Sequence, residues 1–373
     1  MTGAAAVDLV ADLVVIGGGL VGLAIAAAAA DRKLSVAVLT TQRPGTASRA
    51  AAGLLVPHYS GEGAGDSVQR FMSAGRDLYP SYVQWAEERS GVRVAFDASG
   101  AIEVARSPAE CATLQRTAPD GAEPLTPVAV ASLEPGLAPT AGGLLYPRDG
   151  SVDNVGLTDA LATIVARHQR ARTIQEPAVR LVITSGRAAT VIAAAGTRVQ
   201  GHRIVLAAGA WSNLIDGLPR PVPVRPVRGQ LCTVRGAPLR HVVLAPDLYM
   251  VTRGGDRTVV GSTMEDVGYD AGTTAEAIEG LRHAAAAACP AFSTQPVVAA
   301  WSGLRPATPD LRPILGTEPD CPELIYACGH SRNGILLAPI TAAVTCAIAL
   351  GEPLAWDISP FTVQRFSADL PRD

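Results

Sequence analysis

Apolar and polar positions near the start of the chain predict a strand, a turn, a helix and a second strand in close succession. Residues 12–16 form a short β-branched apolar run, residues 20–30 are rich in Ala, and residues 35–39 are apolar again. A short β-branched run favours a buried strand, and a longer Ala-rich run favours a helix. The pattern therefore predicts a βαβ unit, the building block of a parallel sheet covered by helices.

The turn of this unit carries glycines at a spacing suited to a dinucleotide. Gly17, Gly19 and Gly22 follow the order G-x-G-x-x-G directly after the first predicted strand. The first glycine permits a tight turn, the second lets a pyrophosphate approach the backbone, and the third allows close packing of helix on strand. The phosphates would lie on the amides of the helix N-terminus, which includes Leu20 and Val21.

One feature of such sites is missing. The second strand of a dinucleotide-binding unit ends in an acid that binds the ribose hydroxyls, and this chain has Thr40 followed by Thr41 there. A neutral hydroxyl is a weaker hydrogen-bond partner than a carboxylate. We therefore expect the adenosine end to be held less tightly. Arg43, which would suit a ribose phosphate, lies close by in a predicted turn.

The apolar run over residues 13–30 also approaches the length that a membrane helix needs. Glycines interrupt it, and its two halves favour different secondary structures. The residues before it include Asp8 and Asp12 but no Lys or Arg, which is the wrong charge for a signal peptide. We interpret the run as buried elements of a globular protein and expect no membrane association.

The middle of the chain predicts a second, separate sheet. Residues 179–209 alternate like a β-meander, and strand patterns recur over residues 222–265. A helix pattern over residues 273–288 and a strand over 296–306 follow. Strands in a run and then a helix favour an inserted α+β domain. No second G-x-G-x-x-G is present, so no nicotinamide domain is expected.

Composition excludes several classes of protein. Hydrophobic residues make up 48% and charged residues 17% of the 373-residue chain, which indicates a globular protein. The net charge of −3 gives no electrostatic case for nucleic acid or an anionic membrane. The six cysteines are scattered without a C-x-x-C pair or a histidine cluster, so we expect neither a metal site nor a disulfide framework, and a cytoplasmic location.

Four polar residues, 330–333, lie between an apolar strand pattern at 324–328 and an apolar helix pattern at 335–350. They could form a solvated loop or a ligand site at a helix N-terminus, where free amides stabilise negative charge. Residues 46–57 are almost free of large side chains and suit close contact with a cofactor, and residues 202–212 predict a buried strand that ends in Ala-Ala-Gly-Ala.

Together with the glycine turn, these segments resemble the D-amino-acid oxidase group of FAD-dependent oxidoreductases. Within that group, the chain is most similar to the glycine oxidases of thiamin biosynthesis, from about Asp12 to about Phe366. The resemblance implies an α/β, Rossmann-like FAD domain of the glutathione-reductase type with an inserted α+β substrate domain. We expect the FAD-binding domain to comprise residues 8–80, 140–215 and 310–366, and the substrate-binding domain 81–139 and 216–309.

The resemblance also implies roles for individual residues. Arg305 matches the arginine that binds the substrate carboxylate, Arg332 matches a second residue on the substrate side, and Tyr249 and Met264 match residues of paired strands that line the pocket. Asp247 stands where glycine oxidases have a histidine, and a carboxylate there would favour cationic amines. The resemblance implies that the glycine turn, Thr40 and Thr41 contact FAD. It implies further FAD contacts at Ala47, Ser48, Ala52, Gly53, Leu54, Val179 (through its backbone, to adenine), Gly209, His330, Ser331, Asn333, Gly334, Ile335 and Leu336.

The implied reaction is hydride transfer from a small amino acid or amine to flavin, followed by reduction of O2 to H2O2. No catalytic base or metal is expected, and a homo-oligomer is implied. FAD is expected to be non-covalent because the segment at 303–316 lacks cysteine, although Cys321 and Cys328 are not far away. The alternatives are a D-amino-acid oxidase, a sarcosine-type oxidase, an amine oxidase of specialised metabolism, a membrane-linked flavin dehydrogenase, and an FAD-binding protein without enzymatic activity.

Overall fold

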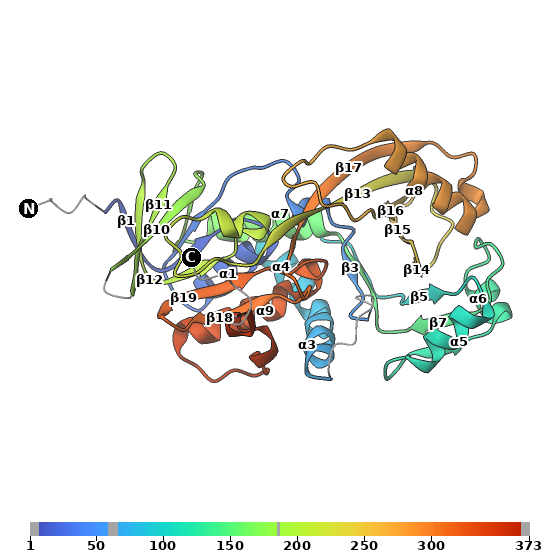
Figure 1. The fold of residues 1–373 in the computed structure, drawn as a ribbon, viewed down its shortest axis with the longest axis horizontal. Helices are drawn as coiled ribbons and strands as arrows, with labels where there is room; N and C mark the ends of the chain where they lie inside the picture. The colour runs from blue at the N-terminus through green and yellow to red at the C-terminus, as the bar shows by residue number, and fades with distance from the viewer. Residues whose placement is uncertain (1–6, 59–65, 185–186, 367–373) are drawn as a thin grey trace, which may run out of the picture.

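The computed structural model describes residues 7–58, 66–184 and 187–366, and it contains two large sheets that lie side by side (Figure 1). The first sheet has a parallel centre. In it β1 (Leu9–Ile16) lies between β2 (Val36–Leu39) and β12 (Arg198–Leu206), β2 pairs with β9 (Ala171–Ile174), and β12 pairs with β19 (Cys321–Cys328), which pairs with β18 (Ile314–Glu318). The predicted βαβ unit is confirmed, with α1 at Leu20–Asp31.

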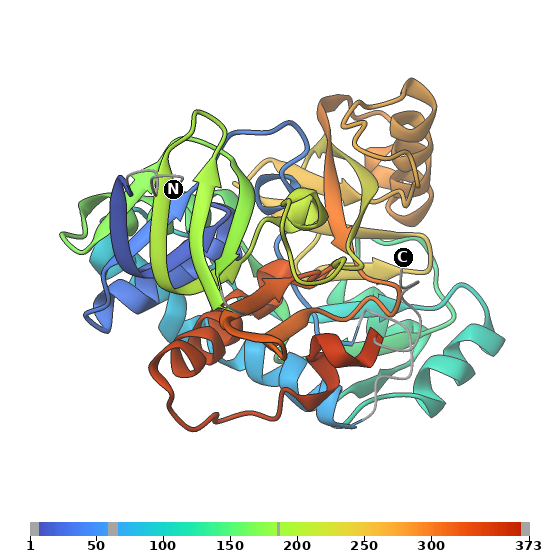
Figure 2. The ribbon, with the colours of Figure 1, turned by 60° about the vertical axis from the view of Figure 1, so that its left-hand side comes forward.

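An antiparallel meander extends this sheet at one edge. It comprises β10 (Ala178–Thr184), β11 (Arg187–Ala193) and the first half of β12. The predicted break at residues 185–186 lies outside the described residues. Figure 2 shows the meander in front of the parallel strands.

One face of the first sheet is covered by helices. They are α1, α3 (Asp66–Asp77), α4 (Tyr79–Ser90), α7 (Asn154–Arg167) and α9 (Gly334–Leu350), which share one apolar core. α1 and α9 are apolar on all sides, which is why they are buried at the centre of this layer. None of the helices in the described ranges combines the length and apolar character that crossing a membrane requires.

The second sheet has the strand order β17, β13, β16, β15, β14, β5, β7, β6. These strands are β17 (Val297–Ala307), β13 (Arg225–Arg235), β16 (Arg257–Gly261), β15 (Leu248–Arg253), β14 (Val242–Ala245), β5 (Ala101–Val104), β7 (Gly143–Tyr146) and β6 (Glu123–Leu125). The helices α5 (Pro108–Arg116), α6 (Pro127–Leu133) and α8 (Ala275–Ala288) accompany this sheet. A short third sheet of β3 (Leu54–Leu55), β8 (Gly150–Val152) and β4 (Phe96–Asp97) joins the two halves.

The fold class predicted from the sequence is confirmed, whereas the division into residue ranges stays a prediction. The predicted boundary at residue 81 falls inside α4, whose Val83 and Ala86 belong to the core around α1. The predicted boundary at residue 140 leaves β7 apart from its partner β5 in the second sheet. Boundaries after β4 and after β7 fit the packing better, because few contacts should cross a domain boundary.

Candidate functional site

A cavity of ≈ 490 Å³ opens where the carboxyl ends of β1 and β2 face the second sheet. Its walls come from the glycine turn, α2 (Ala47–Ala50), the segment up to Leu54, the short helix η1 (Gly209–Leu214), and strands β13, β15 and β17. Ligands of open α/β sheets bind at such carboxyl edges. The cavity is therefore the candidate site.

The glycine turn is shaped by close backbone contacts. Gly17 has φ +116°, and a Cβ there would lie 2.3 Å from the carbonyl oxygen of Ala207. A Cβ at Gly22 would lie 1.9 Å from the carbonyl oxygen of Gly17. The first and third glycines are thus required by chain packing, as the motif predicts. Gly22 itself does not line the cavity, whereas Gly17 and Gly19 do.

The start of α1 already has one polar contact. Gly19 precedes the helix without a side-chain cap, and the amide of Leu20 donates to the Oγ atom of Ser48 at 2.8 Å. The side chain of Leu20 is buried in the core, so any contribution to the cavity is through its backbone. Val21 and Ser48 line the cavity.

The position of the missing acid is filled by a packed threonine. A Cβ added at Gly18 would lie 2.2 Å from the Oγ1 atom of Thr40, so this side chain lies against the glycine turn. Thr40 and Thr41 both line the cavity. Arg43 also lines it, with its guanidinium 5.4 Å from the ring centroid of Trp211.

Trp211 was not predicted as a lining residue in the sequence analysis, although it lies within the segment 202–212 that was singled out. Tyr269 stacks on Trp211 with ring centroids 6.1 Å apart and donates a hydrogen bond to the carbonyl oxygen of Ala210 at 3.1 Å. The loop that contains Tyr269 therefore reaches from the second sheet to η1. Further lining residues that were not predicted include Gly18, Pro177, Ala178, Leu214 and Ile215.

The polar segment before α9 lies at the cavity. Gly329 and Ser331 have φ of +70° and +50°, which makes a sharp turn between β19 and α9. Burial lowers the pKa of His330 to about 4, and its Nε2 atom lies 3.1 Å from the Oγ1 atom of Thr341. The solvated-loop interpretation is thus wrong for His330 and Ser331, which are buried.

The remaining predicted cofactor contacts fall mostly on this cavity. Leu336 does not line it, because its side chain is buried in the helical core. Those that do line it are Ala47, Ala52, Gly53, Leu54, Val179, Gly209, His330, Ser331, Asn333, Gly334 and Ile335.

Arg305 lies on the wall formed by the second sheet. Its Nη1 atom donates to the carbonyl oxygen of Thr263 at 3.1 Å, and its Nη2 atom donates to the Oγ atom of Ser262 at 2.5 Å. A Cβ at Gly229 would lie 2.2 Å from Nη2, so the guanidinium occupies the space that this glycine leaves on the neighbouring strand.

Tyr249 lies beside Arg305 in the same wall, and it is buried. Burial raises the pKa of its phenol, although the positive charges of Arg305 and Arg332 and a hydrogen bond with Ser262 act in the opposite direction. The phenol is thus protonated at neutral pH and lies within electrostatic range of both guanidinium groups.

Two predicted pocket residues are not brought to the cavity. Met264 follows the end of β16 and therefore does not lie on a paired strand; it is 49% exposed, and its sulfur lies 3.1 Å from Nη2 of Arg332. Asp247 occupies the turn between β14 and β15, where its carboxylate pairs with Arg106 at 2.8 Å on the exposed surface. The expected carboxylate near the pocket is wrong: strand alternation would place Asp247 on the same face as Tyr249, but Asp247 precedes β15 and lies in the turn, where its side chain points to solvent and to Arg106.

The charges around the cavity have one sign. Among the described residues that line it, Arg43, Arg305 and Arg332 are cationic, and no Asp or Glu is present. A guanidinium can donate two parallel hydrogen bonds to two oxygens of one carboxylate or phosphate group. In the described ranges no group of His, Cys, Asp and Glu side chains could hold a metal ion.

The fold and the site define a dinucleotide-binding type of protein in which a second, mostly antiparallel sheet places Arg305 in one cavity with the glycine turn. The family model described as FAD dependent oxidoreductase matches residues 12–348. The chain belongs to this family of FAD-dependent oxidoreductases.

Individual relatives span the whole chain. The bifunctional protein ThiO/ThiG of Synechocystis is 34% identical over 369 residues, covering 95% of this chain and 54% of that protein. The glycine oxidase of Geobacillus kaustophilus is 31% identical over 368 residues, covering 95% of this chain and 97% of that protein. The chain thus spans about half the length of the bifunctional relatives it matches.

Solved structures agree with this assignment. The crystal structure of glycine oxidase from Geobacillus kaustophilus superposes with a TM-score of 0.88 at 29% identity, covering 96% of this chain and 99% of that one. The structure of iminodiacetate oxidase from Chelativorans, at 23% identity and a TM-score of 0.85, shares the fold.

Proposed function

We propose that this protein catalyses the FAD-dependent oxidative deamination of glycine or another small amino acid or amine. Substrate and O2 give an imine and H2O2, and water hydrolyses the imine, which for glycine yields glyoxylate and ammonia. The observation that carries the proposal is the position of Arg305, which lies in one cavity with the glycine turn. The glycine oxidases among the relatives support it.

The residues around the cavity fit FAD. The glycine turn and the N-terminus of α1 suit the pyrophosphate, Thr40 and Thr41 suit the ribose, and residues 330–335 with the N-terminus of α9 suit the flavin ring. When bound, FAD would accept the hydride and pass the electrons to O2.

The role proposed for the chain itself is orientation. Arg305 would bind the substrate carboxylate through its planar fork, and Tyr249 and Arg332 would border the same space. No lining residue in the described ranges is a carboxylate, and His330 is neutral and bonded to Thr341. This agrees with a mechanism that needs no catalytic base when the substrate amine is neutral.

We propose that FAD binds without a covalent bond. Cys328 lines the cavity, but burial raises the pKa of its thiol to about 12, so the nucleophilic thiolate is not formed at neutral pH. Cys321 is buried and does not line the cavity. Acid precipitation should release all flavin into the supernatant; flavin retained in the pellet would contradict this proposal.

Oxygen consumption with glycine, sarcosine and a series of D-amino acids tests the proposed activity. We expect H2O2 formation with at least glycine and the highest kcat/KM for a small substrate. A preference for larger D-amino acids would favour a D-amino-acid oxidase, and a preference for N-methylated amines would favour a sarcosine-type oxidase. Turnover with a quinone but not with O2 would favour a membrane-linked dehydrogenase, and no turnover with any donor would favour a binding protein. The homo-oligomeric state and the cytoplasmic location stay predictions.

A further inference from the structure

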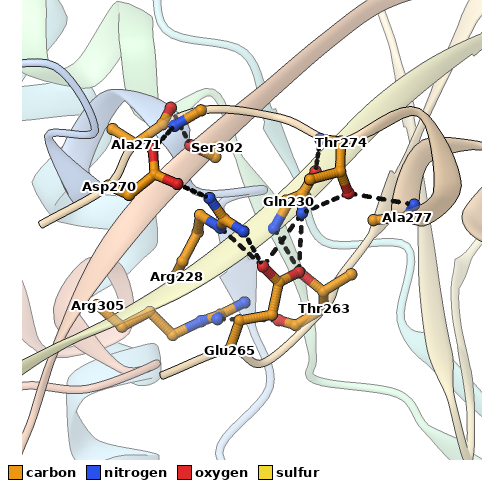
Figure 3. A network of polar contacts seen from close by, with 11 residues as sticks. Arg228, Gln230, Thr263, Glu265, Asp270, Ala271, Thr274, Ala277, Ser302 and Arg305 are labelled. Atoms are coloured by element: carbon orange, nitrogen blue, oxygen red, sulfur yellow. Dashed lines mark hydrogen bonds and ion pairs between the residues drawn. The ribbon is translucent and has the colours of Figure 1, made fainter. Parts of the chain in front are cut away.

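A polar network centred on two buried residues, Arg228 and Gln230, lies on the far side of β13 from the cavity (Figure 3). Successive residues of a strand point to opposite faces. Gly229 and Leu231 line the cavity, and Arg228 and Gln230 therefore lie on the other face, where they are 5% and 0% exposed.

Gln230 is fully engaged in this network. Its backbone amide donates to the Oγ1 atom of Thr263 at 2.8 Å, and its side-chain amide donates to Glu265 at 2.8 Å and to the Oγ1 atom of Thr274 at 3.2 Å. Its side-chain oxygen accepts from the backbone amide of Thr274 at 2.7 Å. The side chain of Gln230 thus ties Glu265 and Thr274 to β13, and its backbone amide ties Thr263.

Arg228 reinforces the same segment. Its Nε atom donates to Glu265 at 2.7 Å and its Nη1 atom to Asp270 at 2.6 Å, while the backbones of Arg228 and Glu265 exchange two hydrogen bonds of 2.9 Å. Although burial would raise the pKa of Glu265, hydrogen bonds from Thr263, Arg228 and Gln230 lower it, so this carboxylate is ionised at neutral pH.

The network continues directly to the cavity. Thr263 accepts from Gln230 with its hydroxyl and from Arg305 with its carbonyl, and Ser262 accepts the second bond from Arg305. Both of these acceptors therefore belong to the segment that Gln230 and Glu265 hold. A hydrogen-bonded network around a buried centre restricts the positions of its members.

We propose that Gln230 and Glu265 are positioning residues that set the orientation of the Arg305 guanidinium for a substrate carboxylate. They act through the backbone and hydroxyl of Thr263 and do not touch the substrate. This inference rests on the proposed function, because it assumes that Arg305 binds a carboxylate.

Glu265→Gln and its neighbour Asp266→Asn form a matched pair. Both remove one negative charge from the same loop, but Asp266 pairs with Arg225 at 2.6 Å on the exposed surface and has no part in the network. The dissociation constant of acetate, a carboxylate without an amine, is measured by titration calorimetry on the flavin-containing protein, together with KM and kcat for glycine.

We expect Glu265→Gln to weaken acetate binding and to raise KM for glycine by about 10-fold or more, with a smaller change in kcat, since small misplacements of a binding group are costly. Asp266→Asn should stay within about 2-fold of wild type, because exposed ion pairs contribute little. Thr263→Val, which keeps the carbonyl but loses the hydroxyl, should act in the same direction, and Thr263→Ser should restore binding.

If Glu265→Gln and Thr263→Val bind acetate as tightly as the wild-type protein and have the same KM for glycine, the positioning role is overturned. The proposed function would stay intact. If Glu265→Gln does not fold, the comparison of Thr263→Val with Thr263→Ser decides. A wild-type protein that neither binds acetate nor oxidises glycine would overturn the proposed function and this inference together.

Discussion

Arg305 is oriented by hydrogen bonds to neighbouring residues, and a glycine on the next strand leaves space for its guanidinium. It donates hydrogen bonds to the carbonyl oxygen of Thr263 and to the hydroxyl of Ser262, and Gly229 leaves space for its guanidinium. A guanidinium bonded to neutral acceptors keeps its positive charge available to an anion. The residue thus combines a fixed orientation with a place on a cavity that no Asp or Glu of the described ranges lines.

Arg305→Leu should remove the carboxylate contact but keep an apolar stem. Losing one partner of a buried charge pair costs roughly 2–5 kcal/mol, so kcat/KM for glycine should fall about 30-fold to several thousand-fold. Steady-state kinetics provides the measurement, with flavin content as the control for folding. An equal loss for an amine without a carboxylate would show that Arg305 acts structurally.

Thr40 offers a second residue-scale test. Thr40→Glu should supply the acid that dinucleotide sites of this kind carry and should lower the dissociation constant of FAD. The expected gain in binding free energy is about 1 kcal/mol, because a charge-assisted hydrogen bond would replace a neutral one. Thr40→Gln is the matched neutral control. Fluorescence titration of the apoprotein measures both. Unchanged affinity in Thr40→Glu would mean that another group already binds the ribose.

At the scale of elements, β15 connects the two walls of the site. Tyr249 near its start lines the cavity, and Arg253 at its end donates from Nη2 to the carbonyl oxygens of Ala52 and Val152, both at 2.6 Å. Between these acceptors lies Gly53, with φ +70° and no room for a Cβ. One strand of the second sheet therefore holds the segment proposed to contact FAD.

Arg253→Met should leave both carbonyl oxygens without this donor while keeping the apolar stem. The loss of hydrogen bonds from a partly buried charged group predicts a decrease of about 2–4 kcal/mol in the free energy of unfolding. FAD affinity should fall as well. Arg257→Met is the control, because Arg257 faces Arg253 in the β-ladder but is exposed. Urea unfolding of the two variants measures the difference in stability. Equal unfolding curves would contradict the role of Arg253 in holding the segment that contains Gly53.

At the scale of the whole molecule, an ion pair links the helical layer to the region between the sheets. Arg76 of α3 donates to Asp149 at 2.7 Å, between β7 and β8, and the second carboxylate oxygen of Asp149 is buried without a hydrogen-bond partner. Burial raises the pKa of Asp149 to about 6 although Arg76 opposes this. His58 and His330 behave oppositely, since burial lowers the pKa of each to about 4.

These shifts predict opposing effects of pH on stability. Between about pH 4 and pH 6, folded Asp149 retains a proton that the unfolded chain has lost, so its contribution to the free energy of unfolding falls as pH rises. The two histidines are protonated mainly in the unfolded chain over the same window, so their contribution rises.

Asp149→Asn should therefore make stability rise more steeply from pH 4.5 to pH 6.5 than in wild type, by about 1–3 kcal/mol over the interval. Thermal unfolding at the two pH values measures the difference. Asp77→Asn, at the exposed side of Arg76, is the control. Parallel pH profiles for wild type and Asp149→Asn would mean that Asp149 is ionised throughout.

The sequence by itself determined the βαβ unit, the turn at Gly17, the class of the fold and most segments that reach the cavity. These features are local: a glycine with positive φ or an apolar run carries its reason within a few residues. Only the tertiary structure decided where strands end and which side chains face the cavity, as Met264 and Asp247 show. The network of Gln230 with Glu265 and Thr274 joins residues 35 and 44 positions apart, so it exists only once β13, β16 and β17 are in register, and no local pattern can indicate it.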